Sequence, residues 1–467
     1  MQQPGLSEGQ ISVGENLSTP PGVLDGVTIM RYAHIYRART SGGVEQHLRQ
    51  LNEGLLQRHR LTILQMHLVG DDGDGRLETE NVGIGRIVWV PVVCRRRAST
   101  LLDIPRRISQ VYARPLRLSR QGPEGRCGAA RSSLQDLMRR YGGYLCRETD
   151  ILSDRLSRLL VTYNVDLVAL HWMDYDTGGL ISRALKAKIP FVFVNHFDNG
   201  RLSHPQTRKW ITQAAGIATI SNRNIPDEFL GRTVNVSNAV DTEFFAPERA
   251  QPIDLAARHI VLLAARIAAG KGHADLMEAA RIMVARNVDL TLCFVGAVDS
   301  EPLHQELRRF AAATGLEKRV LFLGESRKEE IRDWYALSSV VVLPSHSEGL
   351  GRVLLEAQAM KRPVVAYDCG GVSEAILPNE TGFLVKTGNV GALADKISYV
   401  LENETERQHM GERGREFVTR QFSVSALIRR HEAFYCRVLS GGRAKVKSAL
   451  IMCSSESDGA SQTDVLK

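Results

Sequence analysis

The sequence VVLPSHSEGLGRVLLEAQAM, residues 341–360, combines an apolar segment, a polar loop with two glycines and a segment rich in helix formers. The apolar part predicts a buried strand that ends at Leu343, and the last part predicts a helix that begins near Gly351. In parallel α/β sheets, ligands bind outside the carboxyl ends of the strands. The amides of Leu350, Gly351 and Arg352 would lie at a helix N-terminus, where unpaired N–H groups and the helix dipole favour a phosphate.

Two glutamates accompany this loop. Glu348 lies in it, and Glu356 lies about one and a half turns into the helix, by the 3.6-residue repeat. Two carboxylates beside one anion pocket suggest recognition of hydroxyl groups. The alternative is an ordinary glycine-bearing loop with solvated acids.

A second stretch, LLAARIAAGKGHADL at 262–276, places Arg266 at the end of a predicted strand and Lys271 before a predicted helix. Two cations at one strand end can balance the charge of a diphosphate. The alternative is two solvated loop cations. An earlier turn, Gly42–Gly43, precedes another predicted helix, but glycine pairs are common in turns.

The same alternation of strand and helix extends outward along the chain. Residues 27–69 read as strand, glycine-bearing loop, helix and strand, and the second half repeats apolar strands between amphipathic helices. This pattern indicates parallel sheets covered by helices on both faces. The 467 residues are too many for one core. We therefore expect an α/β fold with two Rossmann-like, doubly wound domains.

These motifs together resemble the retaining glycosyltransferases of family 4, which have the GT-B fold. The similarity extends from about Val27 to Leu439 and is most specific in the second half. The family pattern of two glutamates separated by seven residues matches Glu348 and Glu356, and its Arg-x4-Lys-Gly pattern matches residues 266–272. Further matches are Gly42–Gly43, an Asn-Ala-Val-Asp sequence at 238–241, a Gly-Gly-x-x-Glu sequence ending at Glu374, and a Thr-Gly-x-Leu-Val sequence at 381–385.

The resemblance implies a role for each matching residue. Arg266 and Lys271 would neutralise the diphosphate of a UDP- or GDP-linked sugar donor. Glu356 would bind the ribose, and Glu348 the transferred sugar. The remaining donor-binding positions would be Gly42, Gly43, Gly349, Leu350 and Gly351.

The resemblance also places an active-site histidine in the first domain. We assign it to His196, with Glu348 as its partner in catalysis. His171 is the weaker candidate and more typical of a structural strand-end histidine. Arg352 departs from the smaller or apolar residue usual at its position, so the sugar is not assigned.

The resemblance also implies a domain plan. We expect two domains that face each other across a cleft and a C-terminal helix that crosses back to the first. The predicted parts are a disordered leader, 1–24; an acceptor domain, 25–237, with an Arg-rich insertion at 95–158; a nucleotide-sugar domain, 238–420; a crossover helix, 421–440; and a mobile tail, 441–467.

The net charge of +8 is concentrated in one window. Residues 95–158 contain fifteen arginines, six acidic residues and no lysine, a balance of +9. Arginines mixed with apolar residues can lie on an anionic membrane. We hypothesise peripheral contact with a membrane and a glycan or lipid-linked acceptor, and we expect no nucleic-acid partner because no recognised nucleic-acid module is present. The alternative is a mobile, solvated insertion.

Other features suggest a cytoplasmic, metal-independent protein. No apolar run of membrane-spanning length and no secretory signal are visible. The seven cysteines form no CxxC pair, which favours reduced thiols. We expect neither a metal nor a cofactor beyond the sugar donor, because the acidic string at 71–74 reads as a loop.

Two other functions remain to be weighed. An oxidoreductase of the doubly wound class would show G-x-G-x-x-G after its first strand, and TSGGVEQ at 40–46 does not fit. A catalytically inactive binding or scaffold protein could share the fold. Against it, Arg266, Lys271, Glu348 and Glu356 are all present.

Overall fold

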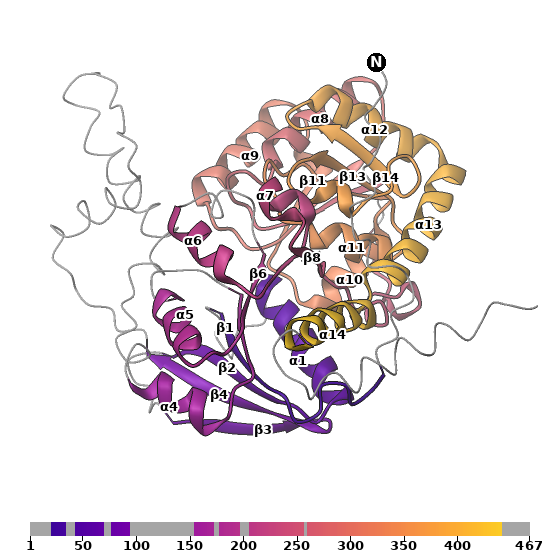
Figure 1. Ribbon diagram of the computed structural model, residues 1–467. Coiled ribbons are helices and arrows are strands. Elements are labelled where there is room, and N and C mark those ends of the chain that lie inside the picture. The colour runs from indigo at the N-terminus through magenta and orange to yellow at the C-terminus, as the bar shows by residue number, and fades with distance from the viewer. Residues whose placement is uncertain are drawn as a thin grey trace, which may run out of the picture.

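The computed structural model describes residues 20–33, 43–69, 76–93, 154–171, 177–196, 205–255 and 259–440 (Figure 1). Residues 1–19, Gly42, the acidic string at 71–74, residues 95–153 of the Arg-rich window and the tail from Gly441 lie outside these ranges. The predicted disordered leader is wrong for residues 20–24, because Leu24 is fully buried in the core of the first domain. The described residues form two α/β domains, each built on its own sheet.

The first domain contains an eight-stranded sheet with the order β3-β4-β2-β1-β5-β6-β7-β8. Its strands are β1 (Thr28–Tyr32), β2 (Thr62–Val69), β3 (Glu78–Val82), β4 (Gly85–Val93), β5 (Leu167–Leu170), β6 (Phe191–Asn195), β7 (Gly216–Thr219) and β8 (Thr233–Asn235). Its helices are α1 (Gly43–Arg58), α4 (Asp154–Thr162), α5 (Thr177–Lys186), α6 (Pro205–Gln213) and α7 (Asp227–Leu230), with a short 3-10 turn at Asn222–Asn224. All strand pairs are parallel except β3 with β4.

The second domain contains a six-stranded parallel sheet with the order β11-β10-β9-β12-β13-β14. Its strands are β9 (Ile260–Ala264), β10 (Thr291–Val295), β11 (Val320–Gly324), β12 (Val340–Leu343), β13 (Val364–Asp368) and β14 (Gly382–Lys386). Its helices are α8 (His273–Ala285), α9 (Glu301–Ala313), α10 (Lys328–Leu337), α11 (Arg352–Ala359), α12 (Val390–Glu402) and α13 (Glu404–Phe422). Short 3-10 turns lie at Pro247–Arg249, Glu317–Arg319 and Val372–Glu374.

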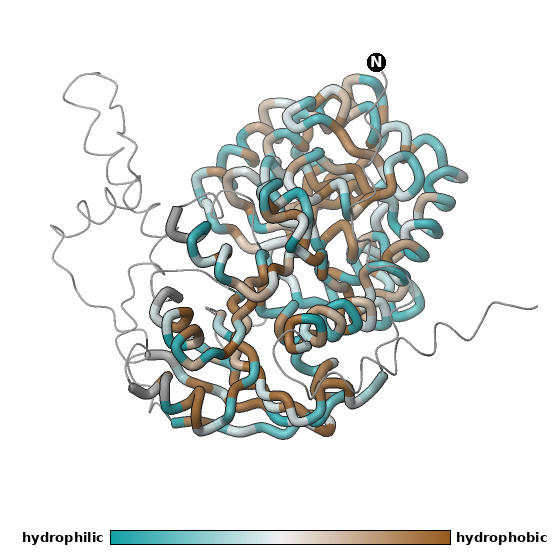
Figure 2. Tube along the Cα trace, viewed as in Figure 1, coloured by the Kyte–Doolittle hydropathy of each residue, from teal (hydrophilic) through white to brown (hydrophobic). Residues whose placement is uncertain are grey.

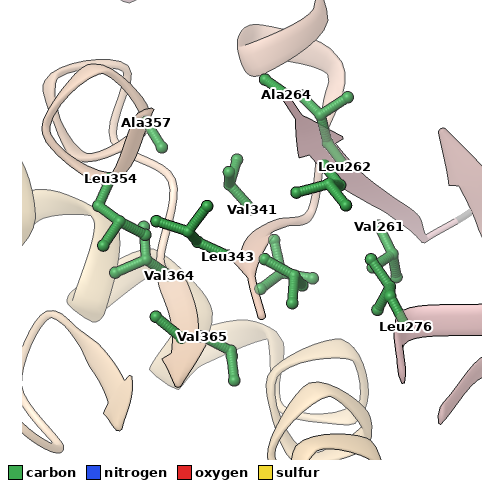
Figure 3. Packing of buried hydrophobic residues seen from close by; sticks show 14 of the residues in the cluster. Val261, Leu262, Ala264, Leu276, Val341, Leu343, Leu354, Ala357, Val364 and Val365 are labelled. Atoms are coloured by element: carbon green, nitrogen blue, oxygen red, sulfur yellow. The ribbon is translucent and has the colours of Figure 1, made fainter. Parts of the chain in front are cut away.

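The core of the second domain lies between its sheet and the surrounding helices. Leu262 of β9, Val341 of β12 and Leu354 of α11 are all fully buried, and Figure 3 shows them packed together. In Figure 2 the brown, apolar residues gather along the strands inside this domain, and teal residues lie on its outer helices. The predicted sheet with helices on both sides is therefore confirmed.

Each sheet has one point where the chain direction across the sheet reverses. In the second domain, β9 leads to β10 and β11 on one side, whereas β12 lies on its other side. In the first domain, β1 lies between β2 and β5. In open α/β sheets the loops on the two sides of such a point diverge, and ligands bind in the crevice between them. The loops after β9 and β12 contain the residues that the sequence singled out.

The last helix, α14 (Val424–Ser440), belongs to the core of the first domain (Figure 1). Leu427, Ile428 and Phe434 cluster with buried residues of β1, β2 and α1. A Cβ at Gly54 of α1 would lie 2.0 Å from Cδ1 of Ile428, so a larger residue would require this side chain to move. The predicted return of the C-terminal helix to the first domain is therefore observed. The helix begins at Val424 rather than at residue 421.

Polar contacts strengthen the attachment of α14. The buried carboxylate of Glu432 accepts hydrogen bonds from Arg58 at 2.6 Å and pairs with His59 at 2.8 Å, measured from its Oε1. The hydroxyl of Tyr435 lies 3.4 Å from Nη2 of the fully buried Arg31. None of the described helices is long and apolar enough to cross a membrane.

Candidate functional site

The loops after β9 and β12 pack against each other. Gly272 begins α8 with a φ of 74°, a left-handed conformation that favours glycine. A Cβ at this position would lie 1.9 Å from the carbonyl oxygen of Pro344, which belongs to the other loop. The amide of His346 donates to the carbonyl of Gly270 at 2.9 Å. The glycine after Lys271 thus lets the two loops form one surface.

Lys271 and Glu348 meet on this surface. The Nζ of Lys271 lies 2.6 Å from Oε1 of Glu348, and their side chains are 28% and 17% exposed. Arg266 follows β9, and its more exposed side chain forms an ion pair with Asp299. Each predicted donor-binding cation therefore has a carboxylate partner in the described part of the chain. A diphosphate would have to replace or share these partners.

The N-terminus of α11 lies beside this pair. Gly351 caps the helix with a φ of 79°, and a Cβ there would lie 2.9 Å from Cδ2 of Leu343. Leu350 is almost fully buried in the core of the second domain, which anchors the loop before this helix. The first amides of a helix have no intrahelical partners and attract anions. The predicted start of the helix is confirmed to within one residue.

Glu356 lies in a separate buried contact. Its Oε2 accepts a hydrogen bond from the hydroxyl of Tyr335 at 3.0 Å. Its Oε1 lies 3.7 Å from Nη2 of Arg352, one helical turn away. Burial raises the pKa of Glu356, although Arg352 and Tyr335 oppose the shift. Sequence reasoning missed Tyr335, which fixes the position of this carboxylate from α10.

His196 and His171 lie together in the first domain. They follow β6 and β5, and Nδ1 of His171 lies 2.9 Å from Nε2 of His196. Both are buried, and burial lowers the pKa of His196 to about 4. The sequence predicts a structural role at a strand end for His171. In the structure, His171 is the hydrogen-bond partner of His196.

Two further histidines, which the sequence analysis missed, complete this cluster. His47 of α1 lies with its ring centroid 4.7 Å from that of His196 and 5.3 Å from that of His431 in α14. The Nδ1 of His47 is 3.2 Å from Oδ1 of Asn238, in the segment that leads to the second domain. Desolvation lowers the pKa of His47 well below its ordinary value and that of His431 to about 3. The four rings are therefore neutral at neutral pH.

Three of these rings, those of His47, His171 and His196, are close enough for a metal ion, with ligand atoms within 4.8 Å of one another. However, the lone pair between His171 and His196 already serves their mutual hydrogen bond. The positive charge of Arg31 acts on His171, and that of Arg352 acts on His47. These cations oppose the binding of a dication, so metal independence stays our prediction.

The donor-side loop touches the first domain directly. A Cβ at Gly349 would lie 3.2 Å from the carbonyl oxygen of His196 and 3.0 Å from Cδ1 of Ile220. The structure therefore brings Glu348, Gly349 and the region of His196 together. Gly43 begins α1, and Gly42 precedes the described part of that helix.

Comparisons with known proteins agree with this architecture. Residues 248–417 match the family described as glycosyl transferases group 1. The alpha-D-kanosaminyltransferase of Streptomyces kanamyceticus is 30% identical over 274 residues, which cover 53% of this chain and 70% of that protein. A capsular polysaccharide biosynthesis glycosyltransferase of Staphylococcus aureus is 28% identical over 38% of this chain and 46% of its own length.

The fold also matches a solved structure over most of the chain. A glycosyltransferase from Rickettsia africae superposes with a TM-score of 0.61 at 19% sequence identity and covers 88% of this chain and 98% of its own. The two Rossmann-like domains form the GT-B fold, and the matches to named glycosyltransferases identify the protein as a glycosyltransferase. The chain belongs to the glycosyl transferases group 1 family.

Proposed function

We propose that this protein is a retaining glycosyltransferase that moves a sugar from a UDP- or GDP-linked donor to a glycan, lipid-linked or small-molecule acceptor. The observation that carries the proposal is the Lys271–Glu348 pair, at 2.6 Å, beside the N-terminus of α11. This surface combines a cation, helix-end amides and a hydroxyl-binding carboxylate. Departure of the nucleotide leaves negative charge on a diphosphate, which fixed positive groups and amides stabilise.

The same pair supports a role for each partner. When a diphosphate approaches, Lys271 exchanges the Glu348 carboxylate for phosphate oxygens, and Glu348 becomes free to accept hydrogen bonds from the sugar. Glu356, already fixed by Tyr335 at 3.0 Å, binds the ribose hydroxyls from the side of α11. His196 faces the sugar from the first domain as a neutral hydrogen-bonding group. No step in this scheme requires a metal.

Native mass spectrometry with a panel of UDP- and GDP-sugars tests the proposal. We expect the protein to bind and slowly hydrolyse one or a few of them, and Lys271→Ala to lose the hydrolysis. Failure of the folded wild-type protein to bind any nucleotide sugar would instead favour the inactive scaffold.

For the acceptor, we propose a glycan or lipid-linked molecule of polysaccharide or glycoconjugate biosynthesis, met at the cytoplasmic face of a membrane. The name of the Staphylococcus aureus relative, a capsular polysaccharide biosynthesis glycosyltransferase, supports such a pathway. The arginine excess of residues 95–158 supports attraction to anionic lipid, at about 1 kcal/mol per basic residue near the surface. Sedimentation with anionic and zwitterionic vesicles at low salt tests the contact. If the intact protein ignores both, a soluble acceptor becomes the better assignment.

A further inference from the structure

Glu374 connects the two domains. It ends the short 3-10 turn that follows β13 in the second domain. Its Oε1 accepts hydrogen bonds from the Ser221 hydroxyl at 2.7 Å and from the Arg223 amide at 3.3 Å, and its Oε2 accepts one from the Asn235 side chain at 2.8 Å. All three donors belong to the first domain, so these bonds exist only while the domains are in contact.

The first domain presents its donors to Glu374 in fixed orientations. The Oδ1 of Asn235 accepts a hydrogen bond from the amide of Ser237 at 2.9 Å, so its NH₂ group must face Glu374. Ser221 is fully buried and lies two residues after the end of β7 at Thr219. A carboxylate, which only accepts hydrogen bonds, matches this set of donors.

The turn that bears Glu374 also supports the donor-side loop. A Cβ at Gly371 would lie 2.2 Å from the carbonyl oxygen of Gly349 and 2.5 Å from the Ser221 hydroxyl. The amide of Gly371 lies 3.4 Å from the carbonyl oxygen of Glu348. The segment Glu348–Gly349 is thus enclosed between this turn and the first domain, and any movement of Glu374 relative to Ser221 must disturb it.

We propose that Glu374 is a positioning residue. Its hydrogen bonds to Ser221, Arg223 and Asn235, which we call the latch, hold the two domains together and place the Glu348–Gly349 segment against the first domain. The inference rests on the proposed donor role of that segment and extends it to a residue that touches no substrate. Glu348 therefore reaches its position near His196 at the same time as the two domains close. The nucleotide half of the site, including Glu356, lies within the second domain and does not depend on the latch.

The same boundary offers a matched control. Arg223 and Asp368 form an ion pair at 2.6 Å, with side chains 51% and 40% exposed. Exposed ion pairs contribute little because water and salt screen them. Arg223→Ala removes this pair but keeps the backbone amide that donates to Glu374.

The test is Glu374→Gln, because an amide has one acceptor oxygen and leaves at least one of the three donors unsatisfied. We expect kcat to fall about tenfold or more, as expected for a hydrogen bond to a charged group. The Kd of free UDP or GDP should stay within about twofold, and Arg223→Ala should keep kcat within about threefold. Adding Asn235→Asp should restore most of the activity, since the new carboxylate accepts the amide of the glutamine and keeps its bond to Ser237.

Hydrogen exchange gives a readout that does not need catalysis. The backbone amides at 219–223 and 345–351 should exchange faster in Glu374→Gln than in the wild type and recover in the double variant. If this exchange is unchanged, the latch is wrong even where the wild type proves to be an active transferase. A joint loss of nucleotide affinity and thermal stability in Glu374→Gln would also overturn it, because that outcome indicates damage to the second domain alone. If no donor is ever found, the exchange data still decide the latch.

Discussion

The two ligand-binding edges of this molecule differ in charge. The edge of the second domain bears Arg266, Lys271 and Glu348 in ion pairs that water still reaches. The edge of the first domain contains buried histidines whose pKa values are lowered by desolvation. One edge can therefore stabilise a departing anion, whereas the other offers neutral hydrogen-bonding groups at neutral pH. In the proposed function, the second domain stabilises the departing negative charge and the first domain orients the sugar.

The largest expected effect tests the charged edge, by which we mean the edge of the second domain with Arg266, Lys271 and Glu348. Lys271→Ala and Arg266→Ala should each lower kcat by on the order of 100-fold or more, because each removes a fixed cation from the leaving diphosphate. Steady-state kinetics of the folded variants measures this, with Lys361→Ala, a half-buried cation paired with Glu412, as the control. Near-normal turnover in both variants would remove the charged edge from the mechanism.

The next effect separates the two glutamates of the charged edge. Glu356→Gln should weaken binding of free UDP or GDP roughly tenfold, since a neutral amide replaces a charged acceptor for ribose hydroxyls. Glu348→Gln should keep nucleotide affinity and weaken binding of the complete nucleotide sugar. Calorimetry with both ligands distinguishes the two roles. Equal losses for both ligands in both variants would show that the residues have no separate functions.

The buried histidines of the first domain, which we call the neutral edge, predict a pH dependence of the free energy of unfolding. The pKa of His196 falls from 6.5 to about 4 on folding, so the unfolded chain binds more protons between these values. The same direction holds for His47, His171 and His431. The free energy of unfolding should therefore decrease as the pH falls from 6.5 towards 4, by about 1.4 kcal/mol per pH unit for each such histidine.

Denaturant titrations at several pH values check this slope. His431→Gln removes one of the groups and should flatten the slope by the share of one histidine. His409→Gln, at an exposed position of α13, controls for the substitution itself. A flat profile in the wild type would mean that the cluster is protonated in the native protein.

The smallest expected effect concerns metals. If the charged edge alone stabilises the leaving group, activity should survive EDTA within the error of the assay. A complete loss that added metal reverses would contradict this prediction and point to the three histidines of the neutral edge as ligands.

The second domain was the easier one to predict from sequence. Its strands are continuous apolar runs, so local patterns placed β12 and α11 closely, although the strand predicted to end at Arg266 ends at Ala264. The hairpin of β3 and β4 was missed because the residues of β3, including Glu78 and Glu80, are mostly exposed and polar. Its strand character comes from pairing with β4 rather than from an apolar pattern.

Contacts distant in sequence could not be predicted in the same way. His47 and His431 occupy buried helical positions that look like ordinary core sites, and 384 residues separate them. The domain-bridging role of Glu374 depends on Ser221 and Asn235, which belong to another sheet. A motif shows that such a residue recurs in related chains, but only the folded arrangement shows what it touches.

The attachment of α14 to the first domain affects the order in which the protein can fold during synthesis. The core of the first domain uses Leu427, Ile428 and Phe434, and Glu432 of the same helix pairs with His59. These residues leave the ribosome only after the whole second domain has been translated. Until α14 is synthesised, part of the apolar surface of the nascent first domain therefore stays uncovered. The second domain can complete its sheet as soon as its own strands have been synthesised. The domain that is synthesised first is thus the domain that completes its folding last.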